Sequence, residues 1–327
     1  MPKEATCTIL VLNWNGRAHL EHLLPSLRAA REAHGGRVPI VVVDNRSTTD
    51  DVAWLRAAYP DIDVHIAERN DYLFSLNGVV ATRREDVVVV LNNDMRVEPS
   101  FIAPLLAHFA DPGVFAVSAS VREWDGCSPQ IGPRRIRFER FWLTHWFELG
   151  ALEPCYTAEA GGGCSAYRRS YFSELGGFDP LYSPGYWEDF DLSYRAWRRG
   201  WTSIFEPRSV IYHRAGATLG GTLSDRRRDC LLERNRMLFL LKNVGDWRFA
   251  AGVLGRLPYR VLYNATCGNR AAARGMLAAI PRIARALRAR RTLDAERLSP
   301  ADIAAAVARP LTRPCSPVDM VPIGALT

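Results

Sequence analysis

The sequence predicts an α/β protein with a mostly parallel sheet, helices on both faces of that sheet, and a helical extension toward the C-terminal end. Three observations predict it. Strand-like and helix-like segments alternate through the first hundred residues, the pattern of parallel strands joined by crossover helices. Three strand-like runs end abruptly on Asn or Asp. Residues 226–297 are helical, basic and amphipathic in pattern, with 17 Lys and Arg against 5 Asp and Glu.

The first predicted unit is a βαβ motif. The runs at 8–12 and 39–44 are continuous and β-branched, as strands buried on both faces of a sheet usually are. Leucines between them recur on one helical face; they are Leu20, Leu23, Leu24 and Leu27. Pro25 predicts that this helix bends or starts late. The alternation continues with a helix at 50–60, a strand at 62–68, a short helix at 76–84 and a strand at 86–92.

Polar residues follow three of these strands, at 13–16, 44–51 and 92–94. Any one such stretch is more typical of a turn or a helix cap. Because ligands of open α/β sheets bind beyond the carboxyl ends of the strands, the three together favour a binding site at one edge.

Composition excludes several classes. With 327 residues and 48% hydrophobic content, the chain fits one large domain or two fused subdomains. Its seven cysteines are scattered and form no C-x-x-C pair, which argues against a disulfide framework or a zinc ribbon and favours a reducing compartment. We find no secretory signal and no uncharged run near the about 20 residues of a membrane span. A cytoplasmic protein is expected.

The middle of the chain, from about 110 to 225, is rich in aromatic residues, Gly and Pro, and is expected to form a second subdomain on the first. Within it, "EDFDL" (188–192) opens a helix that Gly200 ends. Carboxylates at a helix start can be simple caps. The preceding "GGFDPLYSPGYW" has the composition of a loop that shapes a pocket for a polar, ring-shaped substrate, and a carboxylate presented there is a candidate general base.

His213 follows a strand-like segment and precedes a Gly-rich loop. A lone histidine is more often structural than a metal ligand. Paired with Asp94, it could complete an octahedral divalent-cation site whose other positions go to phosphate oxygens and water.

Five stretches, in this order, resemble a family 2 glycosyltransferase of the inverting GT-A (Rossmann-like) type, in its rhamnosyltransferase-like branch. They are "TILVLNWNG", "VVVDNRSTTDD", "VVVVLNNDMRVEPSF", "GGFDPLYSPGYWEDFDLSYRAWRRGW" and "ERNRMLFLLKN". The resemblance covers roughly residues 6–245.

For the donor, the resemblance implies a nucleotide pocket. Asp44 would contact the nucleobase, a uracil or thymine, with Asn13 and Asn15 lining the same pocket. Asn92 and Asn93 would serve ribose, phosphate or the local turn. Arg234 and Arg236 would contact the diphosphate.

For the reaction, the resemblance implies that Asp94 and His213 hold a divalent cation, Mn²⁺ or Mg²⁺. Asp189 would be the catalytic base and Glu188 would position the acceptor. Trp187 and Asp191, from the same segment, are expected to contact the acceptor. In an inverting transfer a base and a charge-stabilising group act on opposite sides of the anomeric carbon.

The sequence departs from the family pattern at the donor side. The D-x-D position reads Asn92-Asn93-Asp94, Arg46 stands where a small residue is usual, and residues 70–78 have Tyr72 or Leu73 in place of a glycine. These departures leave the sugar open.

The expected function is transfer of a sugar, rhamnose from dTDP-rhamnose or a sugar from a UDP donor, onto a hydroxyl of a cell-surface polysaccharide or lipid-linked glycan. Two alternatives are a catalytically weak glycan-binding scaffold or partner subunit, and a sugar nucleotidylyltransferase, although "NWNGRAHLEHLL" has too few glycines for the latter. The predicted organisation is a nucleotide-sugar half (1–110), an acceptor and catalytic half (111–225), a basic helical region (226–300) and a flexible tail (301–327).

In the basic region, residues 270–291 predict a helix with an apolar side and seven arginines around it; that side comprises Met276, Leu277, Ile280, Ile283, Ala284 and Leu287. The helix either packs on the catalytic domain or lies on an anionic membrane, on the inner face of the cell membrane. Nucleic-acid binding is not favoured, because no matching motif accompanies the arginines.

Overall fold

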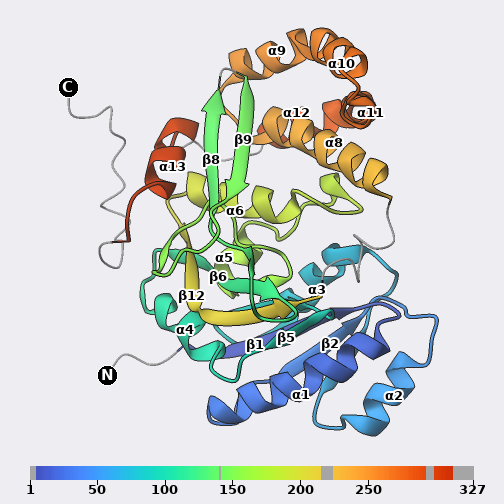
Figure 1. Ribbon diagram of the computed structural model, residues 1–327, viewed down its shortest axis with the longest axis vertical. Coiled ribbons are helices and arrows are strands. Elements are labelled where there is room, and N and C mark those ends of the chain that lie inside the picture. The colour runs from blue at the N-terminus through green and yellow to red at the C-terminus, as the bar shows by residue number, and fades with distance from the viewer. Residues whose placement is uncertain (1–4, 140, 215–223, 292–297, 312–327) are drawn as a thin grey trace.

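The computed structural model describes residues 5–139, 141–214, 224–291 and 298–311. In these residues one large sheet carries helices on its faces, and a helical layer stands at one end of the molecule beside a two-stranded hairpin (Figure 1). The predicted α/β fold with a C-terminal helical extension is confirmed. In the part of the chain that is described, no helix is long and apolar enough to cross a bilayer.

The large sheet has the strand order β10-β12-β6-β11-β4-β1-β2-β3, with β5 and β7 pairing β12 and β6. The strands are β1 (Cys7–Asn13), β2 (Ile40–Asp44), β3 (Asp63–Ile66), β4 (Val87–Asn92), β5 (Met95–Val97), β6 (Val114–Glu123), β7 (Pro129–Ile131), β10 (Cys155–Tyr156), β11 (Cys164–Arg168) and β12 (Thr202–His213). The four strands β3, β2, β1 and β4 are parallel, as predicted.

The second half of the sheet is mixed. Strand β11 runs antiparallel to both of its neighbours, β4 and β6, while β12 is parallel to β6. The run Val87–Leu91 is buried throughout because β4 lies between β1 and β11 with both faces covered. Residues on either side of position 110 share one hydrophobic core.

Helices flank the strands: α1 (Arg17–Ala33), α2 (Asp51–Ala58), α3 (Leu76–Thr82), α4 (Ile102–Ala107), α5 (Arg169–Glu174) and α6 (Glu188–Arg198). The predicted leucines of α1 are all buried. Helix α1 starts at Arg17 and continues through Pro25, so the expected late start is wrong. Pro25 is exposed on this helix.

The C-terminal layer comprises α8 (Asp225–Asn243), α9 (Trp247–Gly255), α10 (Leu257–Thr266), α11 (Arg270–Ala279), α12 (Ile283–Arg291) and α13 (Pro300–Val307). The hairpin β8 (Arg134–Glu139) and β9 (Trp142–Phe147) stands against it. The single helix expected at 270–291 is divided at Pro281 by a 3₁₀ turn.

The apolar side expected for that helix is partly wrong. Leu277 and Ile280 are exposed, whereas small residues of α11 face α8. A side chain at Gly275 would overlap the carbonyl of Cys230 in α8, so this contact depends on close backbone approach. Helix α11 therefore packs on α8, through alanine, glycine and Met276 rather than leucine.

The prediction of a flexible tail from residue 301 is wrong for α13 (Pro300–Val307). Ser299 and Asp302 form a reciprocal capping box at its start, and Ile303 and Val307 are buried. Arg135 of β8 donates to the Val307 carbonyl at 2.7 Å, which holds the helix against the hairpin. Residues 312–327, the rest of the expected tail, lie outside the described residues.

Candidate active site

The ends of β1, β2 and β4 meet at one edge, as predicted. Asn13 pairs with Asp44 in the strand register, and its Nδ2 donates to Asp44 at 3.1 Å and to Asp51 at 2.9 Å. Asn93 donates to Oδ1 of Asn13 at 2.8 Å. A Cβ at Gly16 would overlap the Asn93 amide. The strand ends therefore form one buried, mutually hydrogen-bonded cluster that requires glycine at position 16.

Asp44 is part of that cluster. Its carboxylate also accepts from the backbone N–H of Ser47 at 2.9 Å and from the Ser47 hydroxyl at 2.6 Å. The expected nucleobase contact would thus have to use the remaining acceptor capacity of a carboxylate that already holds the turn. Asn15 lies at the exposed rim, where its Oδ1 accepts from the backbone N–H of Thr48 at 2.7 Å.

Sequence reasoning missed Asn45. It is buried beside Asp44, its Nδ2 donates to the Tyr72 carbonyl at 2.8 Å, and its Oδ1 is buried with no hydrogen-bond partner. Its place directly after Asp44 at a strand end was the available signal.

Asn92 faces a glycine segment, Gly161–Gly163, whose role the sequence did not reveal. The backbone N–H of Asn92 donates to the Gly163 carbonyl at 3.0 Å, and a Cβ on Gly163 would overlap the Asn92 side chain. The next residue back, Gly162, donates its N–H to Oδ2 of Asp189 at 3.0 Å. One short segment thereby connects the end of β4 to the first turn of α6.

Asp94 and His213 are brought together, as expected for two ligands of one cation. His213 pairs with Met95 in the register of β12 and β5, which places its Nε2 3.3 Å from Oδ2 of Asp94. Asp94 is 2% exposed, and neither of its carboxylate oxygens makes a hydrogen bond.

These two residues fit a divalent cation. A buried carboxylate without hydrogen bonds is costly unless another group compensates it. Nδ1 of His213 lies 2.7 Å from Oε1 of Gln130, an acceptor that fixes the proton on Nδ1 and leaves the Nε2 lone pair free to bind metal. Within the described residues no group of three or more His, Cys, Asp or Glu gathers where it could hold a cation.

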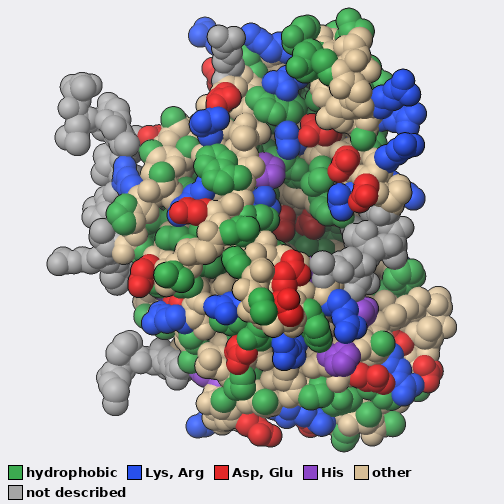
Figure 2. All heavy atoms as spheres, in the orientation of Figure 1, with side chains coloured by type: hydrophobic (Ala, Val, Ile, Leu, Met, Phe, Trp, Pro, Cys, Tyr) green, Lys and Arg blue, Asp and Glu red, His purple; other side chains and the backbone are tan. Residues whose placement is uncertain are grey.

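Three carboxyl groups gather at the first turn of α6: those of Glu188, Asp189 and Glu159. Burial, followed by repulsion from Asp189, raises the pKa of Glu188 well above its usual range. Burial raises the pKa of Glu159 to about 7, against the lowering effect of Arg134, whose Nε lies 2.6 Å from Oε2 of Glu159. Asp189 is half-buried. Figure 2 shows acidic side chains in a recess between the helical layer and the sheet.

Trp187 precedes this turn in a left-handed backbone conformation, with φ of 78°. Such a conformation is strained for a bulky residue. The side-chain amide of Asn235 on α8 holds the loop in place by donating to the carbonyls of Tyr182, Gly185 and Tyr186. The Trp187 ring is buried against Phe190, Phe239 and His145, so it supports the wall of the recess.

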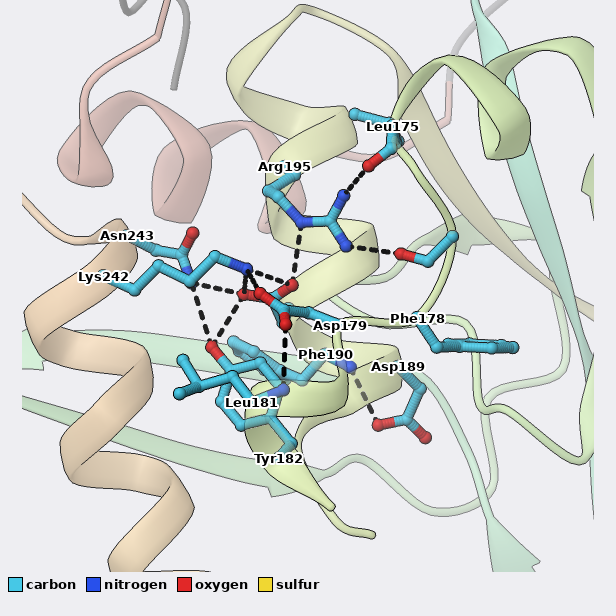
Figure 3. Close-up of polar contacts among 12 residues, drawn as sticks. Leu175, Phe178, Asp179, Leu181, Tyr182, Asp189, Phe190, Arg195, Lys242 and Asn243 are labelled. Carbon is cyan, nitrogen blue, oxygen red and sulfur yellow. Dashed lines mark hydrogen bonds and ion pairs between the residues drawn. The ribbon is translucent and has the colours of Figure 1, made fainter. Parts of the chain in front are cut away.

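Asp191 lies two residues after Asp189 on α6 and is 0% exposed. Its carboxylate accepts from Lys242, Asn243, Tyr182 and Arg195, at 2.6 to 2.9 Å (Figure 3). Although burial alone would raise it, Lys242 and Arg195 hold the pKa of Asp191 well below its usual range. The expectation that Asp191 contacts the acceptor is not supported, because no part of its side chain reaches solvent.

The two arginines of "ERNR" have different surroundings. Arg234 donates to the carbonyls of Tyr182 and Ser183, at 3.2 and 2.6 Å. Burial, with Arg282 nearby, lowers its pKa to about 10. Arg236 lies over the rings of Trp142 and Trp187, and its Nε is buried with no hydrogen-bond partner. These contacts of Arg234 are structural, and those of Arg236 belong to the wall of the recess.

Among curated proteins, the chain is 29% identical over 239 residues to an N-acetylglucosaminyl-diphospho-decaprenol L-rhamnosyltransferase of Mycobacterium tuberculosis, across 64% of this chain and 76% of that one.

Solved structures share the fold at low identity. GalNAc-T7 with UDP, GalNAc and Mn²⁺ matches with a TM-score of 0.54 and 17% identity, over 74% of this chain and 48% of its own. A mannosyltransferase of Pyrobaculum calidifontis with GDP-Man and Mn²⁺ matches with a TM-score of 0.53 and 17% identity, over 86% of this chain and 88% of its own. TarS 1–349 of S. aureus with UDP matches with a TM-score of 0.51 and 14% identity, over 77% of this chain and 71% of its own. These neighbours are GT-A glycosyltransferases.

The model of the family described as "Glycosyltransferase like family 2" matches residues 4–230, the part of the chain that builds the sheet, α6 and the strand-end cluster. Because that match covers well over half of the chain, the protein belongs to this family and is a transferase.

Proposed function

We propose that the protein transfers a sugar, with inversion, from a nucleoside diphosphate donor to a hydroxyl group of a glycan, with Asp189 as the base. The observation that carries this proposal is the placement of Asp189. Gly162 and Gly163 connect its carboxylate to Asn92 at the end of β4, so a base lies beside the strand edge where donors of open α/β sheets bind.

The donor occupies the strand edge in this proposal. Asn15 is exposed at the rim, and Asn13, Asp44, Asn92 and Asn93 shape the floor. Asp94 and His213 hold a Mn²⁺ or Mg²⁺ ion there, and the orphaned Asp94 carboxylate supports that assignment. When bound, the cation neutralises charge that develops on the departing diphosphate. Arg236 is the second source of positive charge.

The chemical step places its groups on two sides of the anomeric carbon. The acceptor oxygen forms a bond to that carbon while the bond to the diphosphate oxygen breaks, and the diphosphate leaves with the electron pair. Asp189 takes the hydroxyl proton. Glu188, whose pKa is raised by burial and by repulsion from Asp189, lies beside it and positions the acceptor.

The proposed donor sugar is rhamnose from dTDP-rhamnose, with a UDP-sugar second, and the proposed acceptor is a lipid-linked or polysaccharide glycan. The rhamnosyltransferase of M. tuberculosis supports this choice. A glycan-binding scaffold would have no need for a buried Asp94 carboxylate without hydrogen bonds, and family membership argues against a nucleotidylyltransferase.

The test is a donor panel. The protein is incubated with dTDP-rhamnose, UDP-sugars and GDP-mannose, with Mn²⁺ or with EDTA, and its melting temperature and sugar transfer are both measured. We expect selective stabilisation by one nucleotide class, and a product of inverted anomeric configuration by NMR. Retained configuration, or full transfer in EDTA, would refute the corresponding part of the proposal.

A further inference from the structure

The region 247–291 carries charge of one sign only. It contains ten arginines and no Asp or Glu. In the described residues it forms α9, α10, α11 and α12 at one end of the molecule (Figure 1). Figure 2 shows blue Lys and Arg side chains around hydrophobic ones at this end. Six of these arginines are exposed in the described residues, namely Arg248, Arg256, Arg270, Arg274, Arg285 and Arg288, and such a surface attracts anionic partners.

Helix α10 presents apolar side chains to solvent in this region. None of its residues is buried. Tyr259, Leu262 and Tyr263 are 68, 64 and 55% exposed, and their i, i+3, i+4 spacing places them on one helical face. We call these three residues the α10 face.

The α10 face is not part of the protein core. Leu257 and Val261, on the other side of the helix, pack against the core, and Arg260 stacks over Trp142 at 3.6 Å. Helix α10 is therefore fixed through its inner side, which leaves its outer side to another partner. Trp247 and Leu277, on the adjoining α9 and α11, are also about half exposed.

We propose that the α10 face docks on the surface of an anionic lipid bilayer. Tyrosine rings favour the membrane–water interface, leucine enters the acyl boundary, and nearby arginines attract anionic headgroups, each by about 1 kcal/mol. A second copy of this chain would bring two arginine-only surfaces together, which repel. Nucleic acid would satisfy the arginines and leave Leu262 without an apolar partner.

This inference goes beyond the proposed function. It also assigns the membrane contact to α10, whereas the sequence placed it at residues 270–291. Of the residues expected on the apolar side of 270–291, Met276 faces the protein interior. Leu277 and Ile280 of that side are about half exposed, and the more exposed apolar stripe is the α10 face.

The experiment is flotation of the full chain with vesicles. At low salt we expect the protein to float with phosphatidylglycerol-containing vesicles and to remain at the bottom with pure phosphatidylcholine. The triple variant Tyr259→Gln, Leu262→Gln, Tyr263→Gln should reduce partitioning by at least about tenfold, because it removes apolar insertion and keeps every charge. Gln is a good helix former, and these positions are exposed, so the helix should persist.

The matched control is Leu152→Gln. Among the described residues, Leu152 is the most exposed large apolar side chain, but it lies outside the arginine region, and its replacement should leave flotation unchanged. Undiminished flotation of the triple variant, or a wild-type protein that stays at the bottom at low salt, overturns the proposal. So does displacement from vesicles by DNA with equal affinity in wild type and triple variant, or sedimentation as a dimer that the triple variant abolishes.

Flotation requires no sugar transfer. Melting-temperature shifts with nucleotides are measured on the same samples, so failure of membrane docking and failure of the proposed donor chemistry are separate results.

Discussion

Two carboxyl groups of α6, three positions apart, have opposite surroundings. Around Asp191, four side chains donate to the carboxylate. At the first turn, Glu188 has a side-chain oxygen buried with no hydrogen bond, and burial, followed by repulsion from Asp189, raises its pKa. The comparison teaches that mutually satisfied polar groups build the framework here, while those left unsatisfied lie where a substrate would complete them.

The largest expected effect tests the unsatisfied region. Asp189→Asn keeps the side-chain shape but removes the proton acceptor, so we expect sugar transfer to fall about 10²- to 10⁴-fold while nucleotide binding is retained. Steady-state transfer assays with melting curves measure both. The exposed Asp63→Asn is the matched control. If Asp189→Asn transfers within a few-fold of wild type, the base lies elsewhere.

The satisfied region should respond in stability instead. Lys242→Met leaves Asp191 buried with Arg195 as its remaining cation, and breaking a buried pair usually costs about 3–5 kcal/mol. Because Arg195 remains, we expect about 3 kcal/mol by urea unfolding. The double variant with Asp191→Asn should lose less than the two single losses combined. Additive losses would contradict the pairing.

Glu159 sharpens the comparison through pH. Its pKa in the folded protein is raised to about 7 from 4.5, so the folded state binds the proton more tightly than the unfolded state. The stabilisation that this proton gives the folded state is full below pH 4.5. It is lost as pH rises through 7, which lowers the unfolding free energy by up to about 3 kcal/mol. Glu159→Gln should flatten the fall in unfolding free energy between pH 5 and pH 8. An unchanged slope would show that Glu159 does not carry it.

The smallest expected effect concerns the cation. Gln130→Leu removes the acceptor that orients His213, and loss of such outer contacts typically lowers metal affinity 10- to 100-fold. Mn²⁺ titration of the nucleotide complex, followed by melting temperature, measures the shift. Equal Mn²⁺ affinity in variant and wild type would remove Gln130 from the site.

Much of the fold could be predicted because its signals are local. The strands expected at 8–12, 39–44 and 86–92 appear within a residue or two as β1, β2 and β4, since a continuous β-branched run followed by polar residues specifies a buried strand and its end. The convergence of Asn13, Asp44 and Asn93 followed from parallel pairing.

What could not be predicted depends on contacts between distant segments. Asp191 and Asp189 look alike in the sequence, and only the return of α8 with Lys242 separates their roles. Gln130 and Glu159 carry no motif, and their importance arises from the partners β12 and β8 bring to them. The inward side of α11 was misassigned because Gly275 allows α8 to approach more closely than leucine packing would.

The glycine segment 161–163 has a consequence for engineering new specificity. Its carbonyl and amide bind Asn92 on one side and Asp189 on the other, and a β-carbon at 163 would displace the Asn92 amide. Substitutions chosen to reshape a sugar pocket at these glycines would therefore shift the proposed base as well. A designer who wishes to change donor specificity and acceptor specificity independently would have to keep this glycine segment and vary the residues on either side of it.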